Sequence, residues 1–161
     1  MLHHISIAVQ NPLHVAEVLA EILKGHVAPF PFNPGSYVAL AGDEFGTLIE
    51  LYPLGSELIP NAWEGEAGFQ INQQSSHYTP FHAAVSVPIS LEEIERIGTR
   101  EGWRVFSASR DGLFDVIEFW VENRLMLEFL TPAIAHKYLQ ALDPDTLPAL
   151  INQLTLVDAR R

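Results

Sequence analysis

The chain contains no cysteine, which excludes disulfides, thiolate nucleophiles and cysteine-ligated zinc or iron–sulfur sites. It has only two lysines, Lys24 and Lys137, and its formal net charge is −11 at pH 7, so DNA, RNA and anionic membranes are unsuitable partners. No apolar run is long enough to cross a bilayer, and the start of the chain has no basic segment followed by an apolar run. These absences predict a cytoplasmic protein that acts on, or binds, a small molecule.

A spacing that occurs twice is the most informative feature that is present. His4 begins an alternating segment, and Glu50 follows 46 residues later; His82 begins a similar segment, and Glu128 again follows after 46 residues. The histidines and the glutamates are both separated by 78 residues. The chain of 161 residues, 48% apolar, is therefore expected to form one domain from two copies of a module. The expected parts are module one (2–54), a connector (55–80), module two (81–132) and C-terminal helices (133–157).

The hydrophobic pattern predicts a strand, a helix and then two or three strands in module one. His4–Val9 alternates in the manner of a half-buried strand, with His4, Ser6 and Ala8 on one face. Asn11 and Pro12 favour the start of a helix, which ends at Lys24-Gly25. The prolines of segment 29–35 exclude a helix there. The strands expected after that segment are residues 37–41 and 47–52.

Module two repeats this order. A strand at 82–87 precedes a helix that starts with the capping-box pair Ser90 and Glu93 and stops near Gly102. Three strands are expected next, at 104–108, 114–121 and 125–130. A connector as long as 55–80 is typical of a functional lid or a disordered span. Segments 133–142 and 146–156 are predicted to be helices that pack on the outside.

The four repeated residues are candidate metal ligands. Two imidazoles and two carboxylates suit one divalent ion such as Ni, Co, Zn, Mn or Fe, and small neighbours leave room for it. Taken singly, the residues have simpler interpretations: His82 as a structural or surface histidine, and Glu50 as the solvent-facing residue of an edge strand. His3 competes with His4, but its parity places it on the apolar face with Ile5 and Ile7. The coincidence of repeat, residue type and strand position favours His4, Glu50, His82 and Glu128 as the metal site.

The motif His-x-x-apolar-small-Val, present twice, and the motif apolar-x-Glu-apolar, present twice, resemble the vicinal-oxygen-chelate superfamily over residues 2–132. This superfamily includes glyoxalase I, methylmalonyl-CoA epimerase, extradiol dioxygenases and fosfomycin- and bleomycin-resistance proteins. The resemblance implies an α+β fold in which two βαβββ modules form a cupped mixed sheet. It implies metal ligands on the first and last strands of each module, which are the positions of His4, Glu50, His82 and Glu128.

The same resemblance implies a glyoxalase-like, metal-dependent lyase, isomerase or epimerase that acts on a small oxygenated substrate through a carbonyl or enediolate. Either Glu128 or Glu50 would then be the base. Glyoxalase I itself is a poor match, because Ala8 and Leu54 stand where the bacterial enzyme has the arginine and asparagine of its glutathione pocket. The alternatives are a ring-cleaving dioxygenase, which generally has only one glutamate ligand, and a metal-free binding protein of the resistance type.

Two further expectations concern surfaces. The apolar outer faces of the first strands, together with the dimers common in the superfamily, imply a homodimer. These faces carry Ile5, Ile7 and Val9 in module one and Ala83, Val85 and Val87 in module two. Arg124 is the candidate anchor for an anionic substrate if its turn leans over the site, although most arginines in turns are simply solvated.

Overall fold

A computed structural model describes residues 2–31, 33–60, 67–110, 112–145, 148 and 151. The chain divides into two compact units, each of which is described by itself. Unit 1 comprises Met1–Ala83 and Trp120–Met126, and unit 2 comprises Ala84–Phe119 and Leu127–Arg161. All of module one and the connector therefore belong to unit 1, together with residues 81–83 and the tip of a hairpin from module two.

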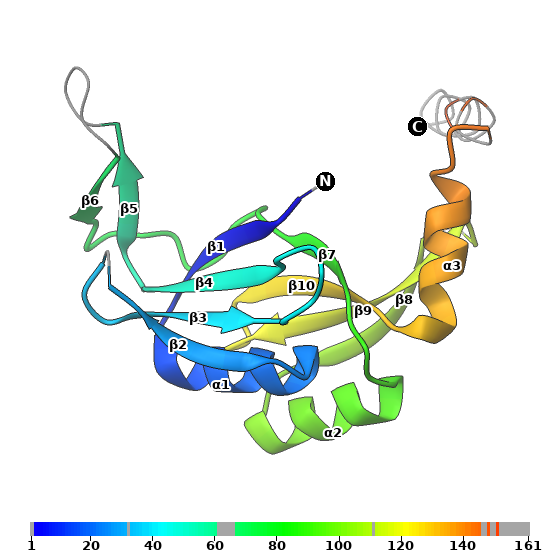
Figure 1. Ribbon diagram of the computed structural model, residues 1–161, viewed down its shortest axis with the longest axis horizontal. Helices are drawn as coiled ribbons and strands as arrows, with labels where there is room; N and C mark the ends of the chain where they lie inside the picture. Colours follow the sequence, from blue (N-terminus) through cyan, green and yellow to red (C-terminus); the bar gives the residue numbers. More distant parts are fainter. Residues whose placement is uncertain are drawn as a thin grey trace. The chain divides into compact units, whose positions relative to one another are not determined.

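The first sheet has the strand order β1-β4-β3-β2 (Figure 1). Its strands are β1 (His4–Val9), β2 (His26–Phe30), β3 (Ser36–Leu40) and β4 (Leu48–Pro53). β1 runs parallel to β4, whereas β3 is antiparallel to both β4 and β2. The prolines of segment 29–35 do exclude a helix, but Pro29 lies in β2, an edge strand that the sequence pattern left open, where a missing N–H can face away from the sheet.

Helix α1 (Pro12–Leu23) covers one face of this sheet. Asn11 caps its first turn by accepting a hydrogen bond from the backbone N–H of His14, and Lys24 ends it in the left-handed conformation. The apolar face of β1 lies under this helix, with Ile7 and Val9 at most 2% exposed. The face that suggested a dimer interface is thus largely buried within the chain itself. In module two Ala83 and Val85 of that face are half-buried, and a homodimer stays a prediction.

Gly25 joins α1 to β2, at a position where there is no room for a side chain. A Cβ atom at this position would lie 1.8 Å from the backbone carbonyl oxygen of Leu40 in β3. We expect Gly25→Ala to destabilise the fold by about 2 kcal/mol, because the β2–β3 pairing must shift to relieve this overlap. Urea unfolding measures the change. Gly68→Ala is the control, since its Cβ would meet only the Ile59 side chain at 3.6 Å; an equal loss in both variants would contradict the steric explanation.

The second sheet has the same strand order, β7-β10-β9-β8, so the repeated sequence pattern corresponds to a repeated structure. Its strands are β7 (Ala83–Ser86), β8 (Val105–Arg110), β9 (Phe114–Val121) and β10 (Leu125–Leu130). Helix α2 (Leu91–Glu101) lies between β7 and β8 in the chain and has the predicted capping box of Ser90 and Glu93. Ile94 and Ile97 of this helix are buried, as are Phe119 and Phe129 of the sheet.

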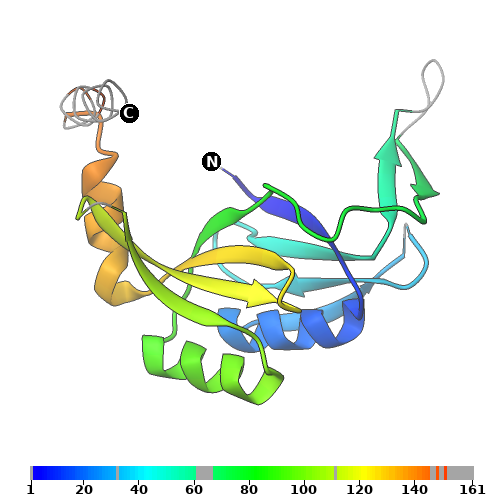
Figure 2. The same cartoon turned by 180° about the vertical axis from the view of Figure 1, so that it is seen from behind.

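Helix α3 (Pro132–Ala141) follows β10 directly and lies beside the end of β8 (Figure 2). Its residues Ile134, Ala135 and Tyr138 pack against a buried cluster of Ala108, Val116 and Leu130. Strand alternation places this cluster on the same face as Arg110, Glu118 and Glu128. Apolar residues on the polar face of the second sheet thus form a seat for this helix, although none of its own residues is fully buried. Most of the second predicted helix, 146–156, lies outside the described residues.

The connector contains a hairpin of its own, formed by β5 (Ser56–Ile59) and β6 (Gly68–Ile71). Gln70 and Asn72 donate hydrogen bonds to the two carboxylate oxygens of Glu57, which ties the strands together beside their backbone pairing. Part of the predicted lid or disordered span is thus an ordered hairpin. None of the helices in the described part of the chain is long and apolar enough to span a membrane.

Candidate functional site

His4 and Glu50 lie on one face of the first sheet, opposite α1. In the β1–β4 register Ser6 is paired with Glu50 and His4 with Leu48, so the two candidate ligands are diagonal neighbours on adjacent strands. His4 is exposed and Glu50 is half-buried. Because β4 lies between β1 and β3, Glu50 is on an interior strand, and its interpretation as the solvent-facing residue of an edge strand is wrong.

Two hydroxyl groups hold the Glu50 carboxylate. Ser6 Oγ donates to Glu50 Oε2 at 2.6 Å, and Tyr52 Oη donates to the same oxygen at 2.8 Å. Among the described residues none donates a hydrogen bond to Oε1. Burial of the phenol, followed by the hydrogen bond and the charge of Glu50, raises the pKa of Tyr52 to about 12. Tyr52 is therefore a hydrogen-bond donor at physiological pH.

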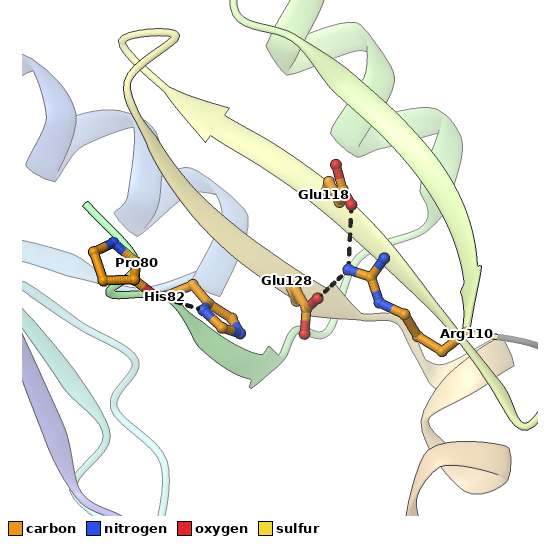
Figure 3. Close-up of polar contacts among 5 residues, drawn as sticks. All are labelled: Pro80, His82, Arg110, Glu118 and Glu128. Atoms are coloured by element: carbon orange, nitrogen blue, oxygen red, sulfur yellow. Dashed lines mark hydrogen bonds and ion pairs between the residues drawn. The ribbon is translucent and has the colours of Figure 1, made fainter. Parts of the chain in front are cut away.

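His82 directly precedes β7, the strand that is paired with β10 in the second sheet. Its side chain is exposed, and Nδ1 lies 3.0 Å from the carbonyl oxygen of Pro80 (Figure 3). A proton on Nδ1 donated to this carbonyl leaves the lone pair of Nε2 available to a metal ion. His3, the competing histidine, instead has its Nδ1 2.6 Å from the carbonyl oxygen of Phe45, beside the β3–β4 turn.

Glu128 lies on β10 and is 8% exposed. Arg110 donates to Glu128 Oε1 and, from the same nitrogen, to Glu118 Oε1 at 3.2 Å (Figure 3). The hydrogen bond to Glu128 is the main cause that raises the pKa of Arg110 above its usual value. Arg110 thus links the two carboxylates of Glu118 and Glu128 through one nitrogen of its guanidinium group. No described residue donates to Glu128 Oε2.

The structure places all four candidate ligands on the first or last strand of a module, or directly before it. It aligns His4 with Glu50 on one sheet face, but among the described residues no three His, Asp or Glu side chains are gathered closely enough to hold a metal ion. The sequence pattern missed Arg110, Glu118 and the role of Tyr52. Tyr52 follows Glu50 by two residues in the same strand, so strand alternation could have placed both side chains on one face. Arg110 meets Glu128 because of how the strands are aligned in the sheet, and this register cannot be read from the sequence.

Arg124 is not an anion anchor. It is 5% exposed, and its guanidinium donates to the backbone carbonyl of Ala8 and, at 3.4 Å, to that of His77. Glu122 from the same turn accepts hydrogen bonds from the backbone N–H groups of Gln10 and Asn11. These hydrogen bonds therefore join the β9–β10 turn to the end of β1, the start of α1 and the connector within unit 1.

Unit 2 contains a cavity of about 680 Å³ between the first turns of α2 and α3. Its wall is mainly apolar, and none of the four candidate ligands lines it. The residues that line it are Pro88, Ile89, Ser90, Leu91, Glu92, Glu93, Ser107, Asp115, Val116, Ile117, Thr131, Pro132, Ala133 and Ile134. The cavity therefore reaches the seat of α3 through Val116 and Ile134 but does not include the Glu128 side chain.

Comparison with solved structures identifies the fold. The fosfomycin resistance protein FosX from Listeria monocytogenes, complexed with Mn(II) and sulfate, matches with a TM-score of 0.54 at 14% identity, covering 87% of this chain and 94% of that chain. Its hexagonal crystal form matches with a TM-score of 0.52 at 14% identity, covering 81% and 92%. No family model matches the sequence, and a search of curated proteins also finds no match. The chain thus has the α+β fold of the vicinal-oxygen-chelate superfamily, as its two βαβββ modules predicted.

Proposed function

We propose that this chain is a metal-dependent lyase or isomerase that acts on a small oxygenated substrate, with His4, Glu50, His82 and Glu128 as the ligands of one divalent ion. The observation that supports this is shared by three of the four side chains. Glu50, His82 and Glu128 each have one polar atom bound by a neighbouring group, while no described residue bonds to the other. Metal ligands are typically oriented in this way by a second layer of hydrogen bonds.

The donor set also fits the chemistry. When bound, a divalent ion supplies a Lewis acid that polarises a carbonyl or hydroxyl oxygen of the substrate. Either Glu50 or Glu128 would act as the base. The base would take a proton from a substrate carbon atom next to that oxygen.

The ion pair of Arg110 with Glu128 favours a second candidate, a metal-free binding protein. In that case the guanidinium supplies positive charge on the polar face of the second sheet and binds part of the ligand directly. The oriented polar atoms of Glu50, His82 and Glu128 make the metal-dependent function the stronger candidate.

Elemental analysis of untreated protein, followed by calorimetric titration of the chelator-treated protein with Mn²⁺, tests the proposal. Mn²⁺ is the first ion to use because FosX, which has this fold, was solved in complex with Mn(II). We expect about one divalent ion per chain, and strong loss of binding when His4 and His82 are both replaced by alanine. Protein that purifies without metal and binds no Mn²⁺, Ni²⁺, Co²⁺, Fe²⁺ or Zn²⁺ would contradict the proposal and support metal-free binding.

A further inference from the structure

Two hydroxyl groups from adjacent strands converge on one oxygen of Glu50. Ser6 reaches Oε2 from β1, where it is paired directly with Glu50, and Tyr52 reaches it from two residues further along β4. Both distances, 2.6 and 2.8 Å, are those of good O–H···O hydrogen bonds. The carboxylate is therefore bound on one side only.

The donors are themselves fixed. Tyr52 is 6% exposed, and its ring packs edge-on against Phe30 at 5.8 Å and Phe69 at 5.2 Å between ring centroids. Phe69 belongs to β6 of the connector hairpin. With both rings in place the phenol cannot swing away from Glu50 without opening apolar contacts. The connector hairpin thus contributes to the position of a hydroxyl group in the candidate site.

The chemistry of these donors distinguishes Glu50 from a carboxylate that is merely accommodated in the fold. Glu128, which is buried, is paired with the cation of Arg110, whereas half-buried Glu50 is bound within the described part of the chain by hydroxyl groups alone. Two neutral hydroxyl groups satisfy one oxygen and fix its direction, but they leave the negative charge uncompensated. The second oxygen is then oriented and charged, which suits a cation that binds through a single oxygen.

We propose that Ser6 and Tyr52 are positioning residues that hold Glu50 as a one-oxygen ligand for a divalent cation, with the connector hairpin supporting Tyr52 through Phe69. This inference rests on the proposed function, since it assigns roles around one of the proposed ligands. It also gives the connector hairpin a role in the site, which is to hold the ring of Tyr52 in place through Phe69.

Mn²⁺ affinity, measured by calorimetry on the full chain, tests the roles of the two hydroxyls. We expect Tyr52→Phe and Ser6→Ala each to weaken Mn²⁺ binding about 10–100-fold, the usual effect of removing a group that orients a metal ligand. Ser6→Thr keeps the hydroxyl and should restore affinity to within a few-fold of the unmodified protein. Tyr37→Phe removes a phenol hydroxyl from the same sheet, on the face away from Glu50, and should change nothing.

The outcomes separate the inference from the proposed function. If the unmodified protein binds no divalent cation, the proposed function fails. If it binds Mn²⁺ and Tyr52→Phe and Ser6→Ala bind as tightly, only the inference is overturned. Urea unfolding of metal-free protein gives a second test: Tyr52→Phe should lower stability in the unmodified background but not in Glu50→Ala. Equal effects in both backgrounds would show that the hydroxyl does not act through Glu50.

Discussion

Glu128→Gln is expected to weaken Mn²⁺ binding by about 100-fold or more, the larger end of the range for groups around a metal, because it removes a charged ligand itself. Glutamine keeps the shape of the side chain, and its carbonyl oxygen still accepts a hydrogen bond from Arg110, so the fold should be retained. With metal binding lost, any proton-transfer activity should be lost too. Calorimetric titration measures the affinity, and circular dichroism checks that the variant is folded.

Two controls give this result its meaning. Glu118→Gln removes the same charge from the Arg110 cluster but leaves Glu128 in place, so Mn²⁺ affinity should fall much less. His3→Ala removes a histidine whose ring contacts the Phe45 carbonyl, and it should have no effect. If Glu118→Gln weakens binding as much as Glu128→Gln, the cluster acts through its overall charge and Glu128 is not a ligand.

Arg124→Met is expected to destabilise the fold by about 3 kcal/mol, since it removes hydrogen bonds from two carbonyl groups in a buried place. Methionine keeps the apolar length of the side chain, so the loss reports the guanidinium. The guanidinium joins the β9–β10 turn to β1 and the connector by donating to the carbonyls of Ala8 and His77. Its Nε atom is buried without a partner in the described part of the chain, which limits the stabilisation. Urea unfolding measures the effect.

Arg100→Met is the matched control for this variant. Arg100 is an exposed arginine whose salt bridge joins it to the adjacent Glu101, so its loss should cost less than about 1 kcal/mol. A similarly small effect for Arg124→Met would show that the hydrogen bonds of Arg124 to the two carbonyl groups do not stabilise the fold appreciably. It would also remove the explanation for why this turn belongs to unit 1.

The sequence alone was enough to predict the architecture and the location of the candidate ligands. Hydrophobic periodicity and the capping box at Ser90 depend only on residues close together in the chain. The 78-residue repeat is found by comparing two stretches of sequence, so all three signals are available before the structure is known. Strand parity likewise placed His4, Ser6 and Ala8 on one face of the first strand, and the observed β1–β4 register shows that Glu50 lies beside Ser6.

Only the tertiary structure decided how these residues are held. Strand register pairs Ser6 with Glu50 and brings Arg110 to Glu128, and it depends on contacts between distant segments. The seat of α3 arises because Leu130, two residues beyond Glu128, joins apolar residues from β8 and β9 on a face that otherwise carries charge. The sequence made Arg124 a candidate anion anchor on a turn, yet its side chain is buried, because its carbonyl partners lie at residues 8 and 77. Local patterns determine which face a side chain occupies, whereas its partners depend on the packing of segments that are far apart in the chain.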